Sequence, residues 1–113
     1  MIEKYTSGLI VVNNKTYHQD LKIIQGQVVD NWWRKTCHLV DVNDMKDVLD
    51  ASPDIVVIGT GYAENMRVSE DLTSETRHRD IKLVAEDTYK AVQTFNELFS
   101  KGKNVSGVFH LTC

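Results

Sequence analysis

Apolar and polar residues in the first third of the chain follow the short periods that are typical of antiparallel strands. Leu9 to Val12 is apolar on both faces, and Asn13-Asn14-Lys15 supplies residues that tolerate a tight turn, which predicts a hairpin. From Tyr17 to Ile23 polar and apolar residues alternate, which predicts one half-exposed strand. Its outer face carries His18, Asp20 and Lys22. A turn at Gln25-Gly26 then leads into a further predicted strand from Val28 to Trp33.

After residue 40 the pattern changes to that of helices alternating with buried strands. Met45, Val48 and Leu49 lie at positions i, i+3 and i+4, which predicts a short helix. We expect Asn43 to cap this helix and Ser52-Pro53 to end it. Ile55 to Ile58 is an uninterrupted β-branched run, the kind that is covered on both faces in a parallel sheet.

The last third predicts a helix, a strand, a helix and a strand. The first helix spans about Glu70 to Arg79 behind Ser69, and Ile81, Leu83 and Ala85 alternate with other residues as a strand. The second helix has an apolar stripe formed by Ala91, Val92, Phe95, Leu98 and Phe99. Asp87 can cap its start and Gly102 its end. The final strand runs from Val105 to Leu111.

Residues 55 to 111 therefore form a strand-helix-strand-helix-strand series, so the chain is predicted to be an α/β protein. Such crossover connections make neighbouring strands parallel, and their carboxyl ends then meet at one edge of the sheet. The three ends are Gly59-Thr60-Gly61, Glu86-Asp87-Thr88 and Leu111-Thr112-Cys113. Ligands of open α/β sheets bind beyond such ends, which makes this edge a candidate cleft.

Length and composition then limit the protein class. The 113 residues are expected to form a single domain, residues 1–113, with an ordinary hydrophobic fraction of 42%. The net charge of −3 lacks the basic excess of nucleic-acid-binding proteins, so no nucleic acid is expected as a partner. The longest apolar runs are too short to cross a membrane, and residues 1–4 lack the features of a signal peptide. A cytoplasmic location and two reduced thiols are therefore expected.

The candidate cleft has specific residues that could bind a small molecule or an anion. Glycines after an apolar strand let backbone amides approach a phosphate, and an arginine nearby could add a cation. The candidate ligand-binding residues are Gly59, Thr60, Gly61, Arg67, Thr88 and His110. The alternative is a plain strand-to-loop turn, because position 64 is Glu64 where the dinucleotide fingerprint has its third glycine.

A second candidate surface lies around the two adjacent tryptophans. Trp32-Trp33-Arg34 followed by His38 combines residue types that are enriched where proteins bind one another. On a strand the two indoles point to opposite faces, so one is expected in the core and the other in solvent. The alternative is that both rings cover the ends of a small sheet.

Metal and thiol chemistry are weakly supported. Cys37, His38, His110 and Cys113 have suitable atoms for zinc, but Cys37 and His38 are adjacent and lack the spacer of a metal knuckle. No metal and no cofactor are predicted. Thiol redox chemistry at Cys113 would need a depressed thiol pKa that no neighbour in the sequence supplies. No complete catalytic constellation is present, so no catalytic residue is assigned.

The chain resembles a known family over nearly its whole length. The resemblance rests on Phe95-Asn96-Glu97-Leu98, on the ending His110-Leu111-Thr112-Cys113, and on earlier pieces that include Asp20 and Trp33-Arg34. The family consists of small domains of unknown function and includes the adipogenesis-associated domain protein and a mitochondrial complex I assembly factor. Thr73 to Asp80 departs from the pattern, with Arg77, His78 and Asp80 where apolar residues and a glycine are expected.

The resemblance implies both a fold and a kind of function. The implied fold has three layers, β+α/β/α, with N-terminal antiparallel strands beside a βαβαβ part. Family members with known roles act in assembly or differentiation, which favours an uncharacterised binding or assembly-type domain over an enzyme. A protein partner is therefore expected, and a homodimer is a further option. The alternative hypothesis is a small-molecule or anion-binding protein that uses the edge cleft, with or without catalysis.

Overall fold

The structure is a computed structural model that describes residues 1–63 and 65–112. Its strands are β1 (Ile2–Thr6), β2 (Leu9–Val12), β3 (Lys15–Tyr17), β4 (Leu21–Ile24), β5 (Gln27–Val29), β6 (Leu39–Val40), β7 (Ile55–Thr60), β8 (Arg67–Val68), β9 (Lys82–Glu86) and β10 (Val105–His110). Its helices are the 3-10 helix η1 (Val42–Met45), α1 (Lys46–Asp50), α2 (Glu70–His78) and α3 (Thr88–Ser100). The α/β class is thus confirmed.

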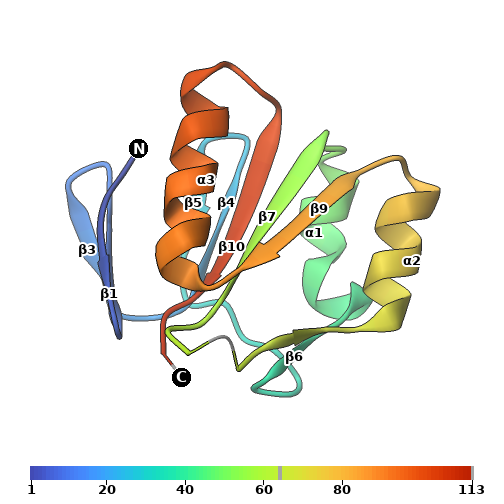
Figure 1. Ribbon diagram of the computed structural model, residues 1–113, viewed down its shortest axis with the longest axis horizontal. Coiled ribbons are helices and arrows are strands. Elements are labelled where there is room, and N and C mark those ends of the chain that lie inside the picture. Colours follow the sequence, from blue (N-terminus) through green and yellow to red (C-terminus); the bar gives the residue numbers. More distant parts are fainter. Residues whose placement is uncertain (64, 113) are drawn as a thin grey trace.

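A five-stranded mixed sheet forms the middle of the molecule, in the order β5-β4-β10-β7-β9 (Figure 1). β10, β7 and β9 are parallel, as the crossover pattern predicts, while β4 and β5 continue the sheet in antiparallel fashion. The register sets His110 beside Thr60 and Gly59 beside Glu86. The carboxyl ends of the three parallel strands therefore meet at one edge.

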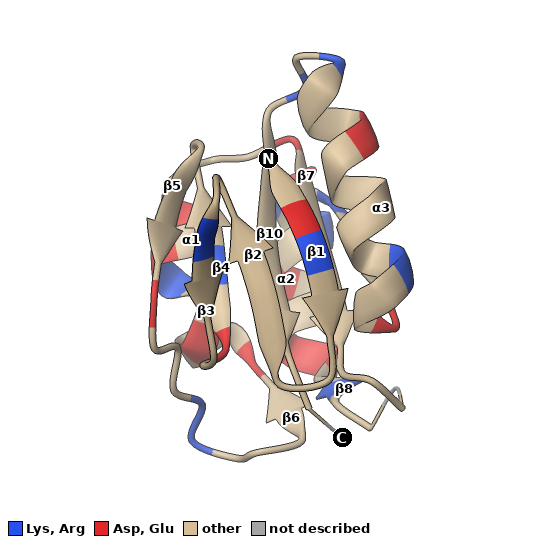
Figure 2. Ribbon diagram, turned by 90° about the vertical axis from the view of Figure 1, so that its left-hand side faces the viewer, with Lys and Arg blue, Asp and Glu red and all other residues tan. Residues whose placement is uncertain are grey.

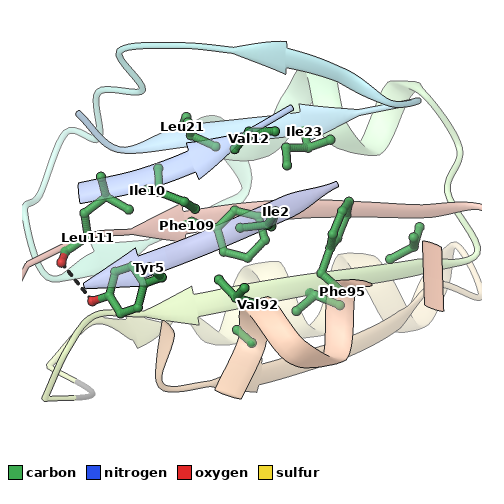
Figure 3. Packing of buried hydrophobic residues seen from close by; sticks show 13 residues of the cluster. Ile2, Tyr5, Ile10, Val12, Leu21, Ile23, Val92, Phe95, Phe109 and Leu111 are labelled. Carbon is green, nitrogen blue, oxygen red and sulfur yellow. Dashed lines mark hydrogen bonds between the residues drawn. The ribbon is translucent and has the colours of Figure 1, made fainter. Parts of the chain in front are cut away.

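One face of this sheet is covered by α3 and by a second, antiparallel sheet of β1, β2 and β3 (Figure 2). Between them lies a core of 13 buried residues, several of which Figure 3 shows around Phe109 and Phe95. The rings of Phe95 and Phe109 meet edge to face at 5.7 Å between centroids. Gly107 makes room for them, since a Cβ there would lie 2.7 Å from Phe109 and 2.8 Å from Phe95.

The opposite face is covered by α1, α2 and the segments that lead into them. Val56, Ile58 and Val108 of the sheet pack there against Leu49 of α1 and Leu72 of α2. The molecule thus has the three layers, β+α/β/α, that the resemblance implies. Within the described part of the chain, no helix combines the length and the apolar character that a membrane crossing needs.

The single alternating strand predicted from Tyr17 to Ile23 is wrong. Tyr17 ends β3, whereas Leu21 begins β4 in the other sheet, so the alternation spans a change of layer. Lys22, expected in solvent, is buried with 7% of its surface exposed. Its ammonium bonds both oxygens of Asp47 at 2.8 and 2.7 Å, and this ion pair compensates the burial of the charge.

The strand predicted from Val28 to Trp33 is also too long. β5 ends at Val29, and Asn31 has a φ of 57°, a left-handed conformation that a strand does not allow. Both tryptophans therefore lie in the segment of residues 30–38, which we call the Trp33 loop. One ring is nevertheless buried and the other exposed, as predicted: 7% of Trp32 and 78% of Trp33 are accessible.

The helices begin where short polar side chains bind free backbone amides. Ser69, the residue before the predicted first helix, caps α2 by accepting from the Leu72 amide, and Asp87 caps α3 as predicted by accepting from the Lys90 amide. The predicted cap Asn43 is wrong, because Asp41 caps η1 in a reciprocal box with Asp44 and Asn43 lies inside that helix. The α2 helix forms although its sequence departs from the family pattern.

Candidate functional site

A cavity of about 400 Å³ lies beside the carboxyl end of β10, beneath the Trp33 loop. It is lined by His18, Gln19, Asp20, Asn31, Trp32, Trp33, Arg34, Lys35, Cys37, His110, Leu111 and Thr112. Four residues singled out from the sequence meet here, because Trp32, Trp33 and Arg34 of the candidate partner surface join His110 of the candidate cleft. Ligand pockets usually have volumes of about 300–1,000 Å³, so the size suits a small ligand or an inserted side chain.

Three polar side chains, which we call the Asp20 cluster, form one wall of the cavity: Asp20, Arg34 and His110. Asp20 Oδ2 accepts from Arg34 Nη1 at 2.8 Å and lies 2.7 Å from His110 Nδ1. Asp20 Oδ1 accepts from the backbone amide of Leu111 at 2.8 Å. The side chains of Arg34 and His110 are only 4% and 3% exposed, so Asp20 neutralises a cation inside the protein.

The hydrogen bonds of the Asp20 cluster keep Asp20 ionised. Burial by itself would raise the pKa of Asp20, but the hydrogen bonds from His110, the Leu111 amide and Arg34 outweigh it and hold the pKa below its ordinary value. A carboxylate only accepts, so the 2.7 Å contact with Asp20 Oδ2 places the proton of His110 on Nδ1, and Arg34 Nη2, 3.1 Å from the same nitrogen, then makes no hydrogen bond to it. This arrangement fixes the ring of His110 through a carboxylate.

The second ring nitrogen of His110, Nε2, is buried in the same region. Among the described residues it makes no hydrogen bond. With the proton on Nδ1, Nε2 is a bare acceptor, and an unpaired buried acceptor costs about 1–3 kcal/mol. The ring of His38 stands edge to face with that of His110 at 6.0 Å between centroids. A bound hydrogen-bond donor could therefore gain energy at this nitrogen.

Arg34 also fixes the Trp33 loop. Its Nε and Nη2 atoms donate to the carbonyl oxygen of Cys37 at 3.2 and 2.9 Å, which closes residues 34–37 into a turn. On the other side of Trp33, the Trp32 amide donates to the Asp20 carbonyl at 2.7 Å, and the Trp32 ring packs 4.7 Å from the Arg34 guanidinium carbon. Trp33 is thus presented to solvent between two anchored neighbours.

The glycine edge of the candidate cleft has a different structure. Thr88 is fully buried there, accepts from the Gly61 amide at 2.9 Å and donates to the His110 carbonyl at 2.5 Å. The Gly61 amide, which could otherwise face an anion, is therefore already bound. A Cβ at Gly59 would lie 2.8 Å from Thr88 Oγ1, so Gly59 allows close packing of α3.

The remaining candidate residues lie around these two places. Thr60 is buried and donates to the Glu86 carbonyl at 3.1 Å. Arg67 is exposed on β8, and its amide bonds the carbonyl of His38, which is also exposed. Cys37 is an exposed free thiol. Within residues 1–63 and 65–112 no group of three metal-binding side chains occurs, while the predictions that involve Glu64 and Cys113 fall outside the described residues.

Sequence reasoning missed Asp20 as the centre of the site. The alternating pattern predicts Asp20 on the solvent-exposed face of a strand. In the structure Asp20 lies in the connection between β3 and β4 and contacts a histidine 90 positions away. The one available signal was the resemblance, in which Asp20, Arg34 and His110 all take part. The spacing of these three residues along the sequence does not by itself predict that they are in contact.

Comparison with known proteins supports the fold. A family model described as a protein of unknown function (DUF498/DUF598) matches residues 2–110. The conserved hypothetical protein PH1505 from Pyrococcus horikoshii OT3 is 21% identical, with a TM-score of 0.85 over 100% of this chain and 99% of that chain. A structure described as an outer membrane protein from Bartonella henselae is 23% identical, with a TM-score of 0.86 over 99% and 94%. A Bordetella pertussis protein described as a Mth938-like domain is 16% identical, with a TM-score of 0.72 over 98% and 85%.

Proposed function

This chain belongs to the DUF498/DUF598 family of proteins of unknown function, and from that premise we propose that it is a non-enzymatic module that binds another protein through Trp33. The observation that carries the proposal is the exposure of Trp33, at 78%, on a loop that Arg34 and Trp32 hold in place. Exposed tryptophans on ordered surfaces are typical binding hot spots, because burying the ring gains much and little side-chain entropy is lost.

The surroundings of Trp33 indicate what the partner must offer. The cavity next to it is lined by the polar side chains of Gln19, Asn31 and Thr112 and by the charged Lys35. The Arg34 charge, in contrast, is already paired with Asp20 inside the protein. The fitting partner therefore covers the indole with apolar atoms and inserts a neutral or acidic hydrogen-bonding side chain into the cavity. The resemblance to a family with an assembly factor among its members supports a role of this kind, and the location that we propose for it is the cytoplasm.

The experiment compares three immobilised forms of the protein in native lysate: wild type, Trp33→Ala and the control Tyr89→Ala. Tyr89 is also exposed, at 63%, but lies at the start of α3. We expect at least one protein to be captured by wild type and Tyr89→Ala and lost with Trp33→Ala. The purified candidate should then shift Trp33 fluorescence on titration. If every captured protein is retained by Trp33→Ala, the proposal is wrong.

A second candidate function is small-molecule or anion binding in the same cavity. The observations that favour it are the cation of Lys35 in the cavity lining, which suits an anion, and His110, a lining residue whose buried Nε2 has no partner within residues 1–63 and 65–112. A thermal-shift screen with phosphates, nucleotides and carboxylates tests it, since a ligand at 100 times its dissociation constant stabilises the native state by about 2.7 kcal/mol. A true cavity ligand loses its effect in Lys35→Gln but keeps it in Lys101→Gln, which is remote from the cavity. Absence of any shift would remove this candidate.

A further inference from the structure

The edges of the two larger sheets differ in how they are protected from pairing with other chains. The β1 edge is tied to α3, because Asn96 accepts from the Ile2 amide at 3.0 Å and donates to the Ile2 carbonyl at 2.7 Å. β3 and β5 are only three residues long, and short edge strands discourage pairing. β9 has five residues and pairs in unbroken register with β7. It is the edge that offers the longest regular backbone.

Two residues of β9 direct their backbone amides and carbonyls away from β7, toward the open edge of the sheet. The Lys82 amide donates to the Asp54 carbonyl on the β7 side at 3.0 Å. Because successive residues of a strand direct their amides and carbonyls to opposite sides, Lys82, Val84 and Glu86 bond β7, whereas Leu83 and Ala85 face away from the sheet. Ala85 is exposed and Leu83 is half-buried beside a hollow of about 410 Å³ between β9 and α2.

The side chains of β9 are complementary to those of a second β9 strand that runs antiparallel to it. Its sequence is Lys-Leu-Val-Ala-Glu, with a cation at one end and an anion at the other. In an antiparallel pair centred on Val84, Lys82 lies opposite the partner's Glu86, and Leu83 lies opposite the partner's Ala85. The outward-facing residues then exchange hydrogen bonds, and the opposite charges occupy the non-hydrogen-bonded positions, where side chains are closest.

We propose that β9 pairs in this way with β9 of a second copy of the chain, which makes one continuous ten-stranded sheet with a two-fold axis at Val84. A second copy is favoured over an unrelated peptide because one strand supplies both halves of each charge pair, as an isologous interface requires. Glu86 is prepared for this contact, since Thr94 donates to its carboxylate at 2.6 Å and Lys90 lies 3.7 Å from it. These two contacts hold the carboxylate on the α3 face of the sheet.

The inference goes beyond the proposed function and does not depend on it. β9 and β5 are opposite edges of the sheet (Figure 1), and the Trp33 loop follows β5. A β9 dimer would therefore leave the Trp33 loop of each copy outside its interface. A partner with two copies of its own binding segment would gain affinity through avidity.

Charge reversal combined with sedimentation velocity tests the register. We expect wild type to dimerise, and Lys82→Glu or Glu86→Lys to weaken the dimer by roughly tenfold or more, because each change makes two like-charge pairs. The double variant Lys82→Glu/Glu86→Lys should restore dimerisation, since the pairs are then opposite again. A wild-type monomer at all concentrations, a dimer that ignores Lys82→Glu, or failure of the double variant to recover would each overturn the proposal.

Crosslinking at the axis gives an independent measurement. In a background with Cys37→Ser and Cys113→Ser, Val84→Cys sets two thiols opposite each other in a non-hydrogen-bonded pair, at a distance that suits a disulfide. Mild oxidation should give a covalent dimer in high yield. The control Lys101→Cys, exposed at the end of α3, should give little. Equal yields from the two variants would contradict the two-fold axis at Val84.

Discussion

Two junctions at the carboxyl edge of the central sheet bury polar groups in different ways. At the first, the neutral Thr88 hydroxyl bonds the Gly61 amide and the His110 carbonyl and fills the space between them. At the second, the Asp20 cluster buries an ion pair beside a cavity of about 400 Å³ and leaves His110 Nε2 without a partner among the described residues. A neutral junction whose polar groups are all paired stabilises the fold. A charged junction beside a cavity, with a buried nitrogen that lacks a hydrogen-bond partner, is typical of a binding site.

The largest expected effect follows from removing the anion of the open junction. Asp20→Ala leaves the buried Arg34 guanidinium without a countercharge, which should lower the free energy of unfolding by about 3–5 kcal/mol. Urea denaturation measures it. As a control, Glu97→Ala breaks an exposed pair with Lys101 and should change stability by less than about 0.5 kcal/mol. Equal effects of the two changes would show that the Asp20 cluster is not a structural anchor.

The closed junction should respond more modestly. Thr88→Val keeps the shape of the side chain but removes the acceptor of the Gly61 amide, at an expected cost of about 1–3 kcal/mol in unfolding free energy. Thr16→Val, at an exposed position of β3, is the matched control and should be nearly neutral. If Thr88→Val were also neutral, another group would have to satisfy the Gly61 amide.

The two junctions should also differ in their response to acid. The pKa of Asp20 is lowered in the folded state, so its contribution to stability is complete above the ordinary aspartate range near 4 and is lost as the pH falls below it. Unfolding free energies measured from about pH 6 to about pH 2 should show this decline in wild type and in Thr88→Val. The decline should be smaller in Asp20→Asn. An unchanged slope in Asp20→Asn would contradict the assignment.

The smallest effect on stability is expected at the rim of the cavity. Trp33 is mostly exposed, so Trp33→Ala should change the free energy of unfolding by no more than about 0.5 kcal/mol. Trp32→Ala removes a buried ring and should cost about 3–5 kcal/mol. Thermal unfolding of both variants separates the two roles, and strong destabilisation by Trp33→Ala would mean that its ring supports the loop instead of facing a partner.

The sequence predicts features that depend on the local spacing of residues, but it does not predict contacts between residues that are far apart in the chain. The parallel strands, the cap Asp87 and the opposite environments of Trp32 and Trp33 all follow from spacing within a few residues. The left-handed backbone at Asn31, which ends the predicted strand early, does not follow from spacing, and the neighbouring Trp32 amide bonds the carbonyl of a distant residue, Asp20. Similarly, no residue near Gly61 in the sequence indicates that the Gly61 amide donates a hydrogen bond to Thr88. The pair Gly59 and Gly61 after a strand therefore suggests a ligand site from the sequence alone.

The position of β10 affects how the protein is made. β10 is the middle strand of the five, between β4 and β7, yet it comes last in chain order. While a ribosome is still translating the earlier segments, β4 and β7 have no neighbour between them and their facing edges are open. The nascent chain is therefore exposed to aggregation until residues 105–110 emerge, and a stall before that point should produce a species that chaperones bind.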